Sequence, residues 1–309
     1  MDWRIKGLIQ KVLSYAPLGG RIHHKLQRFN GLRRFDRECD IKVEDWGFMI
    51  DHLRTAGVSI AGASLVEIGA GWYPTLPVCC WLAGAAKVTT YDLSRHMQRD
   101  LVEQLAVRLR GHLPTIAKQV GISEQVVEAK YAAFAKAIAR GADVEAATDR
   151  AIVYRAPADF TRSGLPDASV DVVFSNSVLE HVPAGVLRQM FEETKRILKP
   201  GATTFHSINC GDHYAYFDPK VSQLHYLQFS EAEWRMWNND FQYQNRLRAP
   251  EFHRLAREAG LVIEREGSIV HPIRLAELDA IRVHPMFAHY TREEQSVTSV
   301  DMVAKKPLT

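Results

Sequence analysis

The stretch LVEIGAGWYP, residues 65–74, decides the fold. An apolar run ends in Glu67, and Gly69 and Gly71 follow with one residue between them. A strand that leads through Gly-x-Gly into a helix brings backbone amides close to a ligand, because a side chain at either glycine would collide with it. The stretch therefore predicts a nucleotide-like ligand at the end of a buried strand.

Short apolar runs of the same kind recur along the chain and alternate with helical patterns. Strands are expected at 64–70, 87–92, 151–156, 170–176 and 203–209, and helices at 183–201 and 249–260. Two terminal segments, 261–267 and 296–306, alternate enough to close the sheet as an antiparallel pair. The alternation predicts a doubly wound, mostly parallel, seven-stranded α/β sheet.

The chain is expected to divide into a helical N-terminal extension, 1–60, and a main domain, 61–309. Residues 95–150 separate two expected strands by far more than an ordinary loop. Their pattern is helical, with Tyr131 and Phe134 on an apolar face. This insertion is expected to be an extra helical layer or an oligomer contact, or else a lid over the ligand. The sequence does not distinguish between these roles.

Composition excludes several classes of protein. The net charge of the 309 residues is only +3, and no dense basic stripe argues for a nucleic-acid partner. No apolar stretch approaches the roughly 20 residues that a membrane span needs. The four cysteines lack metal-type spacing, which favours reduced thiols in a cytoplasmic protein.

The N-terminal segment has a strong excess of positive charge. Over the first 34 residues, Asp2 is the only acid against these bases: Arg4, Lys6, Lys11, Arg21, Lys25, Arg28, Arg33 and Arg34. Residues 3–16 predict an amphipathic helix, with apolar positions at Ile5, Leu8, Ile9, Val12, Leu13 and Ala16. Packing on the rest of the chain is the expected arrangement, and weak contact with an anionic membrane surface is the alternative.

Acidic residues at the ends of the strands indicate which ligand binds. A dinucleotide fingerprint would need a third glycine where this chain has Pro74. Glu67 would place a carboxylate beside the ligand, which suits the cationic groups of S-adenosylmethionine. Asp92 ends the next strand and can accept hydrogen bonds from a ribose, and Asp159 can accept the adenine amino proton beside Phe160.

With FSNSVLEHV at 174–182 and GLPDASVDVVFSN at 164–176, residues 60–210 and the closing strands resemble the class I S-adenosylmethionine-dependent methyltransferases, in their broad type 11-like group. The resemblance implies that the cofactor is bound by Glu67, Gly69, Ala70, Gly71, Asp92, Leu93, Asp159, Phe160, Ser175 and Asn176. GWYPTLP departs from the family pattern. Its aromatic residues Trp72 and Tyr73 either cap the core or wall the acceptor pocket.

Methyl transfer to a hydroxyl needs a group that removes its proton, whereas a neutral amine attacks unaided. His181, at the end of the fourth strand, is the first candidate for this base, with a bracing role as the alternative. His213, with Asp212 nearby, is the second candidate. Asp212 and His213 offer two metal ligands without a third at recognisable spacing, so no metal site is expected.

Residues 210–250 are rich in aromatic side chains, among them Trp234 and Trp237, with Arg246 close by. They predict either a cover over the acceptor or a satellite core under a long loop. The predicted function is O-methylation of a small polar acceptor, such as a sugar or glycan precursor or a natural product. The alternatives are an N-methyltransferase, an NAD(P)-linked oxidoreductase and a non-catalytic cofactor-binding partner protein, and an oligomer is left open.

Overall fold

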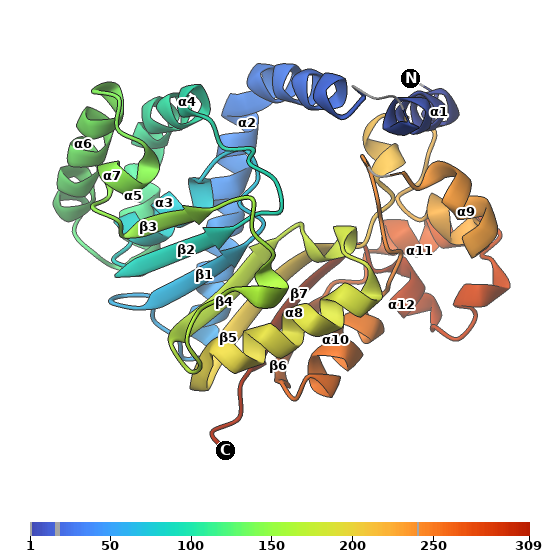
Figure 1. Cartoon of the computed structure of the whole chain (residues 1–309). Coiled ribbons are helices and arrows are strands. Elements are labelled where there is room, and N and C mark those ends of the chain that lie inside the picture. Colours follow the sequence, from blue (N-terminus) through green and yellow to red (C-terminus); the bar gives the residue numbers. More distant parts are fainter. Residues whose placement is uncertain (1, 16–18, 240) are drawn as a thin grey trace.

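Seven strands form one sheet in the order β3-β2-β1-β4-β5-β7-β6 (Figure 1). The computed structural model describes residues 2–15, 19–239 and 241–309, and among these the side chains outside 14–34. The strands are β1 (Ser64–Ile68), β2 (Lys87–Tyr91), β3 (Ile152–Arg155), β4 (Val170–Asn176), β5 (Leu198–Asn209), β6 (Val262–Ser268) and β7 (Ser299–Lys305). Strands β1 to β5 are parallel, and β7 runs antiparallel to both β5 and β6. The predicted doubly wound sheet with an antiparallel closing pair is confirmed.

One boundary was predicted wrongly. The helix expected at 183–201 is α8 (Ala184–Ile197), and Leu198 already begins β5 by pairing with Val170. The residues Lys199–Gly201, taken for a helix stop, instead lie in the strand, where the register with β4 shifts between Val170 and Val172. A bulge of this kind lets a strand begin irregularly while its later residues keep their pairing.

Helices cover both faces of the sheet (Figure 1). On one face, α2 (Gly19–Thr55) and α3 (Thr75–Leu82) pack with Leu65 of β1 in the larger core. On the other face, α8 and α10 (Ala249–Glu258) pack with Val66 and Ile68. Successive strand residues point to opposite faces, which is why Leu65, Val66 and Ile68 are all apolar although they pack on different sides of the sheet.

The long segment between β2 and β3 is helical. It holds α4 (Arg99–Leu109), α5 (Leu113–Val120), α6 (Glu124–Ala139) and α7 (Val144–Ala147). The apolar face of α6 is buried at Val127, Tyr131, Phe134 and Ile138, and it joins the larger core with α2 and α3. These helices form a layer at the β3 side of the sheet (Figure 1).

A smaller core stands apart from the sheet. Trp3 of α1 (Trp3–Tyr15) is buried there with Tyr214 and Trp234. The same region includes α9 (Glu231–Trp237), α11 (Pro272–Asp279) and α12 (Arg292–Ser296). The aromatic residues of 210–250 therefore build a satellite core.

Helix α1 packs on the chain through an unexpected face. Trp3, Gly7 and Gln10 are buried, whereas four of the apolar positions that define its amphipathic pattern are exposed: Ile5, Leu8, Ile9 and Val12. Ala16 and the side chains of Arg21, Lys25, Arg28, Arg33 and Arg34 lie outside the described residues. Weak contact of this helix with a membrane surface stays a prediction.

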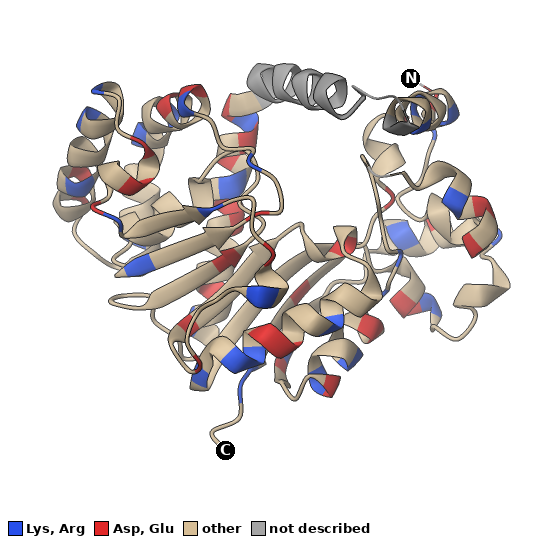
Figure 2. Cartoon of the chain, viewed as in Figure 1, with Lys and Arg blue, Asp and Glu red and all other residues tan. Residues whose placement is uncertain are grey.

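Charged residues are spread over the helices. Along the described ribbon, Lys and Arg are interspersed with Asp and Glu (Figure 2). Among the described residues, no helix is long and apolar enough to cross a membrane. All four cysteines are buried and free of disulfides.

Candidate active site

A cavity of about 710 Å³ opens at the carboxyl ends of β1, β2 and β4. The chain runs from β1 outward to β3 and then returns to β4 on the other side of β1. At such a point the loops after neighbouring strands diverge and leave a crevice, which is where ligands bind in doubly wound sheets. The predicted cofactor loop thus lies on the cavity wall.

In the glycine loop, residues 69–71, the backbone conformation allows a ligand to come close to the main chain. Gly69 and Gly71 have φ of +84° and +61°, in the left-handed region that favours glycine. The Gly69 N–H donates to the Tyr91 carbonyl at 2.8 Å, and the Gly71 N–H donates to Asp92 Oδ2 at 3.0 Å. A Cβ built at Gly71 meets nothing within 4 Å. A ligand can therefore reach the backbone there, as the proposed cofactor requires.

Glu67 faces this cavity from the end of β1. Its carboxylate is 4% exposed and accepts a hydrogen bond from the Thr90 hydroxyl. Burial raises the pKa of Glu67 to about 8, although Thr90 and Lys42 act in the opposite direction. A cationic ligand group would compensate for a charged Glu67.

Asp92 supports the glycine loop and also lines the cavity. Its two carboxylate oxygens accept the N–H groups of Gly71 and Ser94, each at 3.0 Å. A carboxylate has further lone pairs, so these bonds leave capacity for ribose hydroxyls. Leu93, the next residue, is highly exposed in the same wall.

The loop after β3 brings Asp159 and Phe160 to the cavity. Asp159 caps a short 3-10 helix by accepting the Thr161 N–H at 2.9 Å. The buried Phe160 ring meets Tyr91 edge to face, with the ring centroids 5.6 Å apart. Phe160 thus has a fixed orientation against which an aromatic base could pack.

Of the predicted cofactor residues, Ser175 is not placed at the cavity. Ser175 is fully buried, and its hydroxyl lies 2.7 Å from Nδ1 of His206 inside the sheet. Successive residues of β4 point to opposite faces, so only Asn176 reaches the cavity. Asn176 is held by Lys42, which also pairs with Asp45 at 3.6 Å.

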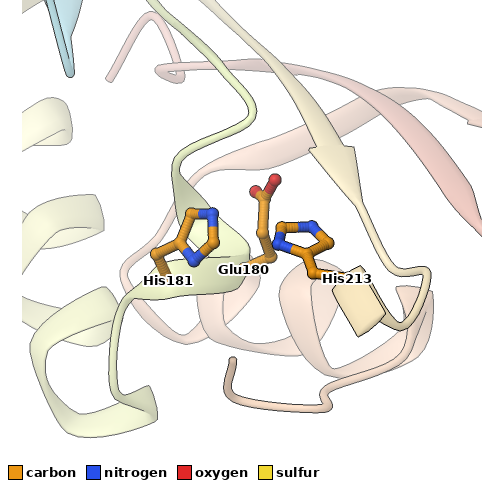
Figure 3. A group of neighbouring side chains, drawn as sticks. All are labelled: Glu180, His181 and His213. Carbon is orange, nitrogen blue, oxygen red and sulfur yellow. The ribbon is translucent and has the colours of Figure 1, made fainter. Parts of the chain in front are cut away.

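Glu180, His181 and His213 meet at the far end of the site (Figure 3). Glu180 and His181 follow β4, and His213 follows β5. His181 lines the cavity, and its ring centroid lies 4.9 Å from that of His213. His213 is not itself among the cavity-lining residues. The structure thus brings the two predicted histidines together, with one of them at the cavity.

Burial is the main cause of the pKa shifts of Glu180, His181 and His213. It lowers the pKa of His213 to about 3 and also lowers the pKa of His181, whose bond to the Tyr243 carbonyl acts in the opposite direction. It raises the pKa of Glu180 to about 8. At neutral pH both imidazoles are therefore uncharged and each keeps a nitrogen lone pair.

Asp212, which directly precedes His213, makes its hydrogen bonds to other residues. Its Oδ2 lies 2.8 Å from Nδ1 of His225, and its Oδ1 accepts the Tyr214 N–H at 2.8 Å. Adjacent residues project in different directions, so a carboxylate directly before a histidine seldom reaches its ring. Glu180, next to His181 in sequence, takes the place near His213.

Arg246 is likewise occupied within the chain. It donates to the carbonyls of Tyr226 and Phe229 and pairs with Glu231 at 2.6 Å. Trp234 is buried beside it. These side chains hold the satellite core together and do not line the cavity.

Several residues that line the cavity were not among the predicted site residues. One face of α2 contributes Glu38, Ile41 and Lys42, which are three and four residues apart. Trp72 and Tyr73 also line the cavity, and Tyr73 packs at the same time against the larger core, so both suggested roles apply to Tyr73. None of the cavity-lining residues belongs to α4–α7, so this helical layer does not cover the described cavity.

Comparison with known proteins gives a family and a set of similar structures. A family model described as a methyltransferase domain matches residues 47–266. The geranyl diphosphate C-methyltransferase of Streptomyces coelicolor A3(2), solved with Mg²⁺, geranyl diphosphate and S-adenosyl-L-homocysteine, is 14% identical over 88% of this chain and 84% of that chain, with a TM-score of 0.49. Phosphoethanolamine N-methyltransferase 2 of Haemonchus contortus, in complex with S-adenosyl-L-methionine, is 14% identical over 85% and 52%, with a TM-score of 0.48. No curated protein sequence gives a significant match.

Proposed function

Because the chain belongs to the methyltransferase domain family, we propose that it methylates a hydroxyl group of a small polar acceptor. Family membership gives the enzyme class, an S-adenosylmethionine-dependent methyltransferase. When bound, the cofactor supplies a methyl group on a positively charged sulfur. The acceptor class, a sugar or glycan precursor or a natural product, belongs to the proposal.

The cofactor is proposed to lie along the glycine loop. Glu67 compensates for the charge of the amino-acid end, the backbone around Gly71 allows close approach, and Asp92 accepts hydrogen bonds from the ribose. Asp159 and Phe160 hold the adenine. The support for this arrangement is that these side chains converge on one cavity at the switch point of the sheet.

The acceptor is proposed to enter between the cofactor and His181. The observation that carries this step is that His181 lines the same cavity as the glycine loop. An in-line methyl transfer mainly needs alignment and exclusion of water. Apolar residues such as Ile41, Val182 and Met190 line the cavity and favour a dry site. His181 and its neighbour His213 activate the hydroxyl for attack.

The test is methyl transfer from a labelled cofactor to pools of hydroxylated acceptors. Replacing His181 or His213 by alanine is expected to lower turnover at least 100-fold while the affinity for S-adenosylhomocysteine changes little. His271→Ala, at an exposed histidine outside the cavity, is the matched control. Full turnover in both test variants would overturn the assignment of these histidines, and cofactor binding without turnover on any pool would favour a non-catalytic partner protein.

A further inference from the structure

Glu180, His181 and His213 come together from two neighbouring strand ends (Figure 3). One potential ligand atom of each residue lies within 4.8 Å of the other two. Glu180 and His181 are on a 3-10 turn after β4, and His213 begins a turn after β5. Because β4 and β5 are parallel, their carboxyl ends hold these turns side by side.

The cluster contains buried polar atoms that the protein leaves unpaired. Glu180 is 2% exposed, and neither of its carboxylate oxygens has a hydrogen-bond partner. The backbone N–H groups of Glu180 itself and Asn209 are near the carboxylate and lower its pKa. Nε2 of His213 is also buried and unpaired. A buried polar atom left in this state destabilises the protein, so the cluster favours an added ligand.

The orientation of His181 fits the same ligand. Its Nδ1 lies 2.6 Å from the carbonyl oxygen of Tyr243. Since a carbonyl can only accept, Nδ1 carries the proton and donates it, which leaves the lone pair on Nε2. Histidines that bind metals almost always donate their other N–H to a carbonyl or carboxylate in this way.

We propose that Glu180, His181 and His213 form a binding site for one divalent transition-metal cation. Two imidazole nitrogens and one carboxylate suit Zn²⁺, Mn²⁺, Fe²⁺ or Co²⁺, whereas Mg²⁺ and Ca²⁺ prefer oxygen ligands. From the sequence no metal site was expected, because Asp212 and His213 lack a third ligand at recognisable spacing. The structure puts Glu180 in that place.

Three protein ligands leave coordination positions open for another molecule. His181 lines the cavity, so the cation would border the space proposed for the acceptor. A hydroxyl bound to the cation has a lowered pKa and loses its proton to solvent, and its oxygen then forms the new C–O bond as the C–S bond of the cofactor breaks. His181 and His213 would thus act on the acceptor through the cation. This role rests on the proposed function, whereas cation binding does not.

The experiment measures the cation in the full chain. The protein is stripped with chelator, dialysed against Zn²⁺, Mn²⁺ or Co²⁺, and analysed for metal per chain and for the visible absorption of bound Co²⁺. We expect one cation per chain in the wild type. Glu180→Gln and His213→Asn are each expected to weaken binding at least 10-fold, whereas His289→Asn, at an exposed histidine beside Glu251, is expected to bind as the wild type does.

Unfolding shifts with S-adenosylhomocysteine separate the possible failures. The metal site would be refuted if the wild type gives this shift but binds no cation. It would also be refuted if the folded variants bind the cation as tightly as the wild type does. In both cases the proposed function would still stand. Loss of the cation in a variant supports the site only if that variant still gives the shift. Absence of the shift in the wild type would instead count against the proposed function.

Discussion

A Cβ atom added to Gly69 would lie 2.4 Å from Cγ2 of Val178. The loop after β1 and the loop after β4 are therefore in direct contact at the wall of the cavity. Gly69 also has a φ of +84°, which a residue with a side chain adopts only at a cost. Both the contact with Val178 and the backbone conformation thus favour glycine at this position.

Gly69→Ala is expected to destabilise the protein by about 2–5 kcal/mol, from about 1–2 for the left-handed backbone and about 1–3 for the overpacked contact. It is also expected to weaken cofactor binding, because Val178 lines the cavity and must move. Urea unfolding and calorimetry with S-adenosylhomocysteine measure both effects. Gly62→Ala is the matched control, since Gly62 has a similar φ of +70° but nothing within 4 Å. Equal losses in the two variants would exclude the contact as a cause.

Asp92→Ala is expected to abolish the unfolding shift given by S-adenosylhomocysteine. The change removes the acceptor for the Gly71 and Ser94 N–H groups together with the proposed ribose contact. A ligand that binds only the folded state raises the unfolding midpoint, so the shift reports binding directly. Asp159→Ala is expected to reduce the shift without removing it, because its carboxylate is exposed. An undiminished shift in Asp92→Ala would contradict the assigned ribose site.

The sheet and most of the cofactor wall follow from local sequence. Each strand is a short, mostly apolar run, and in a parallel sheet the acids and glycines at its carboxyl end lie at one edge. Glu67, near the end of β1, and Gly69 and Asp92, directly after β1 and β2, could therefore be placed at the cavity without a structure. Ser175 is the exception among the residues expected there, because it lies inside the sheet and does not line the cavity. Strand alternation allows only one of two successive residues on a face, and Asn176 is that residue.

The acceptor end depends on contacts between distant segments, and local patterns do not encode them. Lys42 reaches the cavity because α2 packs beside the sheet, and His213 approaches Glu180 because β5 lies beside β4. Helix α1 shows a different limit. Its apolar periodicity predicted the helix correctly. The face that packs on the chain, however, is the one that carries the buried Trp3 and the small Gly7.

Arg248→Lys is expected to destabilise the fold by about 3–5 kcal/mol. Arg248 is fully buried and donates to the carbonyls of Cys210 and Gln295 at 2.8 and 2.9 Å and to the Tyr226 hydroxyl at 2.7 Å. Lysine keeps the charge but lacks the planar fork that reaches several acceptors at once. Chemical unfolding measures the loss.

The control for Arg248 is Arg254→Lys, at an exposed arginine that pairs with Glu258 one helical turn away. Exposed pairs of this kind contribute about 0.3–0.5 kcal/mol, so little change is expected. A loss below about 1 kcal/mol in Arg248→Lys would mean that its hydrogen bonds to the loops around β5 and α12 do not stabilise the fold as inferred.

Cofactor affinity is expected to rise with pH until Glu67 is ionised. Burial raises the pKa of Glu67 to about 8 in the protein without ligand, so the carboxyl group is mostly protonated at pH 7. The positive ammonium group of the cofactor favours the carboxylate and lowers this pKa in the complex. Binding between these two pKa values therefore releases a proton, and the dissociation constant falls by up to about tenfold per pH unit before levelling above pH 8.

Calorimetric titrations with S-adenosylhomocysteine from pH 6 to 8.5, in buffers of different ionisation enthalpy, count the released protons. The wild type is expected to release close to one proton at pH 7, because one group, Glu67, changes its charge. Glu67→Gln keeps the size of the side chain and the bond from Thr90 but cannot titrate, so its affinity is expected to be lower at pH 8 and independent of pH. Proton release that persists in Glu67→Gln would place the titrating group elsewhere in the cavity. Release that is absent from both proteins would mean that the ammonium group does not lie beside Glu67.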